Sequence, residues 1–273
     1  MPKSTYGGST YGGSTPAKKL VIPLVVALAL ALLVLMLLQQ ASSRPAYAAA
    51  AASDVLPDLG MAHPQDLRIR STSDGRRLLR FSSIVVNVGA GPFEVRGQRP
   101  DTNTATMTVT QRVFDEAGGS RHVPTPATMY FGGDGHNHWH VTNLEDFELV
   151  RLDNGTKVGT AAKHGFCFFD NHRYGATAGD PSYLTSASPP ACGRSSSLEV
   201  FAGLSVGWGD IYRYNLPDQY IDITGLKSGR YRLVSEADAD GWFLEGDDSN
   251  NSSWVNIRIS GSNVSVVRYG PSA

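Results

Sequence analysis

Three histidines at alternate positions are the residues of this sequence best suited to chemistry. His136, His138 and His140 lie in the run Gly135-His-Asn-His-Trp-His140. Alternate side chains of a β-strand point to one face, so the three imidazoles would share a face while Trp139 points away. Three imidazoles suit Cu, Zn, Ni or Fe and leave coordination positions open for water or substrate. The run predicts an open metal site; a histidine-rich loop without function is the alternative.

The strand that carries these histidines cannot be straight if all three rings meet one ion. At about 3.3 Å per residue, the outer two Cα atoms lie roughly 13 Å apart, and an imidazole nitrogen reaches only about half of that. Gly132, Gly133 and Gly135 could allow a twist or bulge. No fourth thiolate or carboxylate ligand is evident, which argues against a closed structural zinc site. Spacing alone leaves the metal and the reaction open.

The two cysteines, Cys167 and Cys192, are separated by a loop rich in Gly, Pro and Ser. In an oxidising compartment such a pair is most simply a disulfide. Closing a loop of this size adds roughly 3 kcal/mol on the chain-entropy model. A pair of thiolate metal ligands is the less favoured alternative.

Short β-rich runs separated by turn signals have to position these residues. The strongest signal is Asn154-Gly155 between the runs 144–152 and 156–161, which is typical of a hairpin. No segment after residue 53 shows a convincing helical period. The pattern predicts an all-β fold, a single antiparallel β-sandwich domain with long loops. Further strands are expected at 78–88, 105–114, 166–169, 219–223, 230–236, 254–259 and 264–269, and the longest loop at 171–197.

The first 52 residues differ in composition from the rest of the chain. Residues 1–19 repeat Ser-Thr-Tyr-Gly-Gly and form a low-complexity leader. Residues 20–38 are apolar and uncharged, and an Ala46-Tyr47-Ala48 site and an alanine-rich linker to residue 52 follow. This order predicts an export signal, or an N-terminal membrane anchor through 20–38 if the segment is not cleaved. Residues 53–273 would then form one domain outside the cytoplasm.

The charge of the exported part excludes one class of partner. Removing residues 1–48 deletes four of the 24 basic residues and no acidic one, which leaves 20 against 25 and a net charge of −5. A mildly acidic domain has no electrostatic footprint for nucleic acid. It could favour the approach of cationic substrates such as amines.

An ordered set of motifs across residues 56–258 resembles the lysyl oxidase family of copper-dependent amine oxidases. The histidine run is similar to the His-x-His-x-His copper motif of that family. The set is more specific than any one motif because its members stand in the family's order. The other segments are Leu56-Pro-Asp-Leu59, Arg77-Leu-Leu-Arg-Phe-Ser-Ser83, Leu152-Asp-Asn-Gly-Thr-Lys-Val158, Lys163-His-Gly-Phe-Cys167, Asp210-Ile-Tyr212, Asp218-Gln-Tyr-Ile-Asp-Ile-Thr-Gly225 and Glu245-Gly-Asp-Asp-Ser-Asn-Asn251.

The resemblance implies a catalytic site. The three histidines would bind Cu(II), and Tyr212 would be oxidised and joined to Lys163 to give lysyl tyrosylquinone within the protein. Asp210 matches the position of the catalytic base. The substrate would be a primary amine or a lysine-containing peptide or protein, which O2 oxidises to an aldehyde with release of H2O2. The short, cysteine-poor chain with an export signal is similar to a bacterial secreted branch of the family.

The resemblance also implies a calcium site that ties the N-terminal segment to the last strands. Carboxylates, amide oxygens and a backbone carbonyl are the hard ligands that calcium prefers. The alternative is a solvated acidic turn with local hydrogen bonds. The residues concerned are Asp58, Leu59, Asp247, Asn250 and Asn251.

Two other functions share parts of this pattern. A non-catalytic exported copper-binding module needs the histidines and the β fold but no link between Lys163 and Tyr212. A zinc hydrolase on a β scaffold needs only the metal site. The mass of the copper-treated protein distinguishes a copper-binding module from an oxidase. Metal analysis of the purified protein distinguishes a zinc hydrolase from both.

Overall fold

Buried side chains alternate with more exposed ones along the runs 106–113, 145–149, 231–237 and 253–259, and this period of two is typical of β-strands. The computed structural model describes residues 49–132 and 137–273, which lie in one compact unit, Ala46–Ala273. No helix occurs within those two ranges, so none there is long and apolar enough to span a membrane. The predicted leader and apolar segment, residues 1–48, lie outside the described residues.

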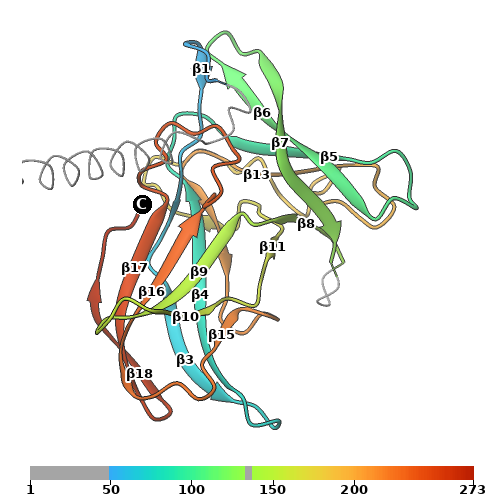
Figure 1. The fold of residues 1–273 in the computed structure, drawn as a ribbon. Coiled ribbons are helices and arrows are strands. Elements are labelled where there is room, and N and C mark those ends of the chain that lie inside the picture. Colours follow the sequence, from blue (N-terminus) through green and yellow to red (C-terminus); the bar gives the residue numbers. More distant parts are fainter. Residues whose placement is uncertain (1–48, 133–136) are drawn as a thin grey trace, which may run out of the picture. The chain divides into compact units, whose positions relative to one another are not determined.

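The described ranges contain eighteen strands, and every pairing between them is antiparallel, which confirms the all-β prediction (Figure 1). They are β1 (Asp54–Val55), β2 (Leu59–Met61), β3 (Gln65–Ser71), β4 (Arg77–Asn87), β5 (Phe93–Gln98), β6 (Thr106–Asp115), β7 (Ser120–Phe131), β8 (Trp139–Thr142), β9 (Glu145–Arg151), β10 (Lys157–Thr160), β11 (Gly165–Phe166), β12 (His172–Arg173), β13 (Glu199–Leu204), β14 (Trp208–Tyr212), β15 (Tyr220–Asp222), β16 (Gly229–Ala237), β17 (Ser252–Ser260) and β18 (Asn263–Tyr269).

Three sheets share these strands. One has the order β11-β8-β7-β6-β5-β13, with β1 paired to β6. The second has the order β10-β9-β16-β17-β18. The third has the order β12-β14-β4-β15, and β2 and β3 also pair with β4. The predicted hairpin is confirmed: β9 and β10 pair across a turn in which Gly155 has a φ of 71°, which favours glycine.

The hydrophobic core joins the three sheets. The ring centroids of Phe81 on β4 and Phe147 on β9 lie 5.0 Å apart in an edge-to-face contact. Phe93 on β5 contacts Phe168 at 5.2 Å and Phe243 at 5.1 Å. These aromatic contacts hold β4 against β9, and β5 against the segments that follow β11 and β16.

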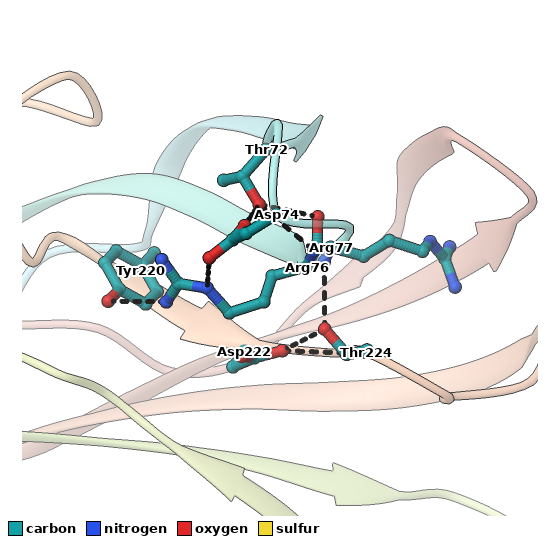
Figure 2. Close-up of polar contacts among 7 residues, drawn as sticks. All are labelled: Thr72, Asp74, Arg76, Arg77, Tyr220, Asp222 and Thr224. Carbon is teal, nitrogen blue, oxygen red and sulfur yellow. Dashed lines mark hydrogen bonds and ion pairs between the residues drawn. The ribbon is translucent and has the colours of Figure 1, made fainter.

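An exposed polar cluster ties the turn between β3 and β4 to β15. Figure 2 shows Arg76 between Asp74 and Tyr220, with its Nε donating to Asp74 Oδ2 at 2.9 Å. The backbone N of Arg77 donates to Thr224 Oγ1 at 2.9 Å. The Arg76 and Asp74 side chains are 44% and 58% exposed, so water screens this contact.

Candidate active site

The histidine run enters β8, which begins at Trp139. His140 is buried and lies opposite Tyr130 of β7, with the two ring centroids 5.6 Å apart. The rings of His138 and His140 are 4.8 Å apart. His136 lies outside the described residues, so two of the three predicted ligands are seen together. Within 49–132 and 137–273, no group of three or more His, Cys, Asp or Glu could hold a metal ion.

Trp139 fixes β8 from the other side. Its backbone N donates to the Cys192 carbonyl at 2.9 Å, and its Nε1 donates to the Arg194 carbonyl at 2.9 Å. The guanidinium carbon of Arg99 stands 4.5 Å from the indole centroid. A buried indole held by two hydrogen bonds and a cation–π contact restrains the strand, and so the imidazoles on either side of it.

Lys163 and Tyr212 come together although 49 residues of sequence separate them. The Lys163 Nζ lies 5.3 Å from the centroid of the Tyr212 ring and 5.3 Å from that of Phe166. Phe166 and Tyr212 meet edge to face at 5.2 Å. The Tyr212 hydroxyl donates to the Cys167 carbonyl at 2.6 Å, which fixes the ring. An amine and a phenol are therefore held side by side in a buried, aromatic environment.

Asp210 lies two residues before Tyr212 on β14 and shares its face of the strand. Its carboxylate accepts a hydrogen bond from Asn171 Nδ2, and Asn171 Oδ1 accepts one from the Ile211 backbone N at 2.8 Å. Burial raises the pKa of Asp210 to about 7, although Tyr212, Asn171 and the charge of Lys163 act in the opposite direction. A carboxyl with that pKa can take up and release a proton at neutral pH.

Glu145 is a site residue that the motif analysis missed. It begins β9, is fully buried and accepts a hydrogen bond from Ser83 Oγ at 3.0 Å. Burial and then the charge of Asp210 raise the pKa of Glu145 to about 8, while Lys163 lowers it. The sequence signal for a buried Glu145 is the alternation along β9, which places Glu145 on the same face as Phe147 and Leu149.

Gly165 shows how closely the surrounding strands approach. A Cβ at this position would lie 1.9 Å from the Tyr130 hydroxyl oxygen. Tyr130 is the partner of His140 across β7 and β8, and Gly165 follows Lys163 by two residues. Glycine at 165 therefore lets the lysine-bearing segment pack against the strand that faces the histidines.

The predicted disulfide between Cys167 and Cys192 is confirmed, with an S–S distance of 2.08 Å and Cα atoms 5.7 Å apart. The alternative of two thiolate ligands is wrong. The backbone carbonyls of both cysteines contact site residues. The Cys167 carbonyl accepts a hydrogen bond from the Tyr212 hydroxyl, and the Cys192 carbonyl accepts one from the Trp139 backbone N.

The predicted calcium ligands are drawn together where the segment between β16 and β17 meets β2. Asn250 hydrogen-bonds to Asp58, and the charge of Asp247 adds to the effect of burial in raising the pKa of Asp58. Within the described ranges, three buried oxygens here have no hydrogen-bond partner, which fits a hard cation. They are Asp58 Oδ1, Asn250 Oδ1 and Asn251 Oδ1.

Sequence reasoning did not single out Glu245 in this cluster. Its Oε2 accepts from the Leu59 backbone N at 2.5 Å and its Oε1 from Asn251 Nδ2 at 3.0 Å. Burial raises its pKa well above the usual range. A desolvated carboxyl that joins two of the predicted ligands belongs to the same constellation.

Comparison with known proteins shows which family the chain resembles. The family model for lysyl oxidase matches residues 101–269. Lysyl oxidase homolog 3 of Homo sapiens is 28% identical over 192 residues, which is 70% of this chain and 20% of that protein. Lysyl oxidase homolog 2 of Xenopus tropicalis is 28% identical over 195 residues, 71% of this chain and 20% of that protein. The chain spans about a fifth of the length of these relatives.

Proposed function

This chain belongs to the lysyl oxidase family, and from that membership we propose that it is an exported copper-dependent amine oxidase. It would convert lysyl side chains or small primary amines to aldehydes, releasing ammonia and reducing O2 to H2O2. The observation that carries this proposal is the Lys163 Nζ held 5.3 Å from the centre of the Tyr212 ring. These are the two side chains that lysyl tyrosylquinone requires.

His136, His138 and His140 would hold the copper. The donor set fits, because neutral imidazoles suit Cu(II) and leave positions open for O2 and water. Bound copper would supply the redox chemistry that converts Tyr212 and Lys163 to lysyl tyrosylquinone, and the quinone carbonyl would supply the electrophile for a primary amine. The protein's own contribution is position and electrostatics.

The buried side chains around Tyr212 would do three things. The hydrogen bond from the Tyr212 hydroxyl to the Cys167 carbonyl orients the ring. The rings of Phe166 and Tyr212 exclude water from the Lys163 amine. Asp210 would accept the proton from the substrate carbon that bears the amine, and its pKa of about 7 suits that transfer.

Asp58, Leu59, Asp247, Asn250 and Asn251 would hold a Ca²⁺ ion, with Glu245 beside them. The buried, unpartnered oxygens of three of these side chains support this proposal. A cation there would stabilise the connection between β2 and the segment that joins β16 to β17.

The test compares copper-loaded wild-type protein with Tyr212→Phe and Lys163→Ala. Wild-type protein should release peroxide with a primary amine and stain for a quinone, and both variants should lose both signals. Tyr214→Phe and Lys157→Ala are matched controls, because Tyr214 lies against Arg68 and Lys157 pairs with Glu148. Wild-type protein that binds copper but shows neither signal nor a change in mass would be a copper-binding module, and the oxidase proposal would fail.

A further inference from the structure

Asn171 is a side chain outside every motif whose contacts determine how the Asp210 carboxyl is held. It lies directly before β12, and continuing the pairing of His172 with Gly209 by one residue places Asn171 opposite Asp210. Its backbone N donates to the Gly209 carbonyl at 3.2 Å. The Asn171 side chain therefore reaches Asp210 from the neighbouring strand of the same sheet.

The two ends of the Asn171 amide have different partners. Oδ1 accepts a hydrogen bond from the Ile211 backbone N at 2.8 Å, and Nδ2 donates to Asp210 Oδ1. A backbone N–H can only donate, so the oxygen of the amide has to face Ile211. This contact fixes which way the amide is turned, and the NH2 group then has to face the carboxyl.

The two oxygens of the Asp210 carboxyl are therefore not equivalent. Oδ1 accepts from the Asn171 amide, and an oxygen that accepts from such a donor does not itself hold the acid proton. Oδ2 is buried, and no hydrogen-bond partner for it lies within the described residues. A proton that Asp210 takes up consequently goes to Oδ2.

The residue that precedes Asn171 anchors the segment from the other side. Asp170 is buried and accepts hydrogen bonds from the backbone N atoms of Ser182 and Tyr183 at 2.9 and 3.0 Å. It also accepts from the backbone N of Ser205 at 2.8 Å and from the Ser205 Oγ at 2.6 Å. Four donors on one carboxylate tie this segment to the long loop and to the residue that follows β13, so the Asn171 backbone is held in place.

We propose that Asn171 is the positioning residue of the base: its amide holds Oδ1 of Asp210 and leaves Oδ2 to accept the proton of the substrate. The inference rests on the proposed role of Asp210 in amine oxidation. It adds which oxygen of that carboxyl exchanges the proton and which residue selects it. Asn171 acts through Asp210 and needs no contact with the amine.

Asn171→Asp tests the donor alone. Asp has the same shape and can still accept from the Ile211 N–H, but it puts a carboxylate oxygen in place of the NH2 group beside Asp210. Two facing carboxylates do not both ionise readily, so the ionisation of Asp210 should move to higher pH. Asn154→Asp is the matched control, because Asn154 Oδ1 accepts from the Thr156 backbone N at 3.0 Å in an exposed turn.

The rate with a saturating primary amine is the first readout. In copper-loaded protein, the acidic limb of kcat against pH should move to higher pH in Asn171→Asp, by about tenfold or more in ionisation constant. It should stay in place in Asn154→Asp. A loss of rate that is uniform at every pH would show that Asn171 only supports the fold. That result, or an unchanged profile, would overturn the proposal.

Carbon-13 NMR of metal-free protein labelled at the aspartate carboxyl carbons is a second readout that needs no turnover. The Asp210 signal is identified by its loss in Asp210→Asn. In Asn171→Leu, which removes the donor without adding a carboxyl, this signal should titrate at higher pH, again by about tenfold or more in ionisation constant. A titration that stays in place, in protein whose circular dichroism shows that it folds, would contradict the proposal.

The two readouts separate this inference from the proposed function. If the chain is not an oxidase, the wild-type protein and the Asn154→Asp control will both lack turnover. The NMR titration then still decides whether Asn171 holds Asp210. Because Asn171→Asp and Asn171→Leu change the amide in different ways, a single misfolded variant does not leave the question unanswered.

Discussion

Two regions of this molecule place aspartate beside a cationic side chain, and they behave in opposite ways. At the exposed turn between β3 and β4, hydrogen bonds from Thr72 and Arg76 lower the pKa of Asp74 to about 2. At the buried face of β14, burial raises the pKa of Asp210 to about 7 although Lys163 is close. The Asp74 carboxylate is exposed and the Asp210 carboxylate is buried, so burial makes the difference between an inert anion and a base near neutrality.

The two clusters also differ in what holds them. The exposed cluster combines a hydrogen bond within the β3–β4 turn with hydrogen bonds from that turn to Tyr220 and Thr224 (Figure 2). The buried cluster takes its members from β4, β9, β14 and the segment before β11, and a disulfide lies beside it. Both clusters join segments that are distant in sequence, but the core keeps the reactive cluster dry, whereas the exposed cluster stays in contact with water.

The largest effect that separates the two clusters should be on catalysis. Asp210→Asn should lower kcat/KM for a primary amine by roughly 10²- to 10⁴-fold at neutral pH, because the general base is lost. Asp74→Asn is the matched control and should retain the wild-type rate. Steady-state peroxide release checks both. Equal losses in the two variants would mean that burial does not distinguish their roles.

Loss of the disulfide should affect the buried cluster next most strongly. The double variant Cys167→Ser with Cys192→Ser should lower the free energy of unfolding by about 2–4 kcal/mol. It should also slow quinone formation, because the Tyr212 and Trp139 hydrogen bonds both end on the bridge. Urea unfolding and intact mass measure the two effects. Unchanged quinone formation in a destabilised variant would show that the bridge stabilises the fold without positioning the site.

The pH dependence of stability should have opposite signs in the two regions. The raised pKa of Glu145, about 8 in the folded chain, means that its contribution is full below pH 4.5 and is lost as the pH rises to about 8. The lowered pKa of Asp74 means that its contribution is present above pH 3.8 and is lost as the pH falls towards 2. Glu145→Gln should therefore flatten part of the decline in the urea midpoint between about pH 5 and 8. A slope identical to that of wild-type protein would contradict the raised pKa.

The smallest effect should come from the exposed cluster itself. Arg76→Ala removes the ion pair with Asp74 and the contact with Tyr220. The midpoint of thermal unfolding should change little, and any difference from wild-type protein should shrink further in high salt. Calorimetry at two ionic strengths measures this. A loss as large as that of the disulfide variant would show that the turn is a structural clamp despite its exposure.

Local signals in the sequence predicted the fold class and the hairpin, but they missed β7. The turn at Asn154-Gly155 and the alternation on each side of it were sufficient for β9 and β10. β7 spans Ser120–Phe131 and contains Pro124 and Pro126, which argue against a strand. The structure accommodates them because the pairing of β6 and β7 shifts register between Thr108 and Thr110, opposite Pro124.

Motifs in the sequence identified some of the site residues, whereas two of the buried carboxyls could be recognised only from the fold. Lys163, Asp210 and Tyr212 stand in recognisable segments; the Lys163 Nζ lies near the Tyr212 ring, and Asp210 and Tyr212 share β14. Glu145 stands in no motif, and Glu245 stands in one that did not single it out as a site residue; only their burial beside other polar groups marks them. The predicted strand 166–169 is shorter in the structure, where it is Gly165–Phe166 and is followed directly by the disulfide-bonded Cys167.

The backbone carbonyls of the two disulfide-bonded cysteines have a consequence for the order in which the site assembles. The Cys167 carbonyl accepts a hydrogen bond from the Tyr212 hydroxyl, and the Cys192 carbonyl accepts one from the backbone N of Trp139, which lies between His138 and His140. In a reducing compartment the thiol form would join these two elements only through noncovalent contacts. Oxidation of Cys167 and Cys192 would thus act as an assembly step, so that the tyrosine and the histidine strand reach their working separation only in an oxidising compartment.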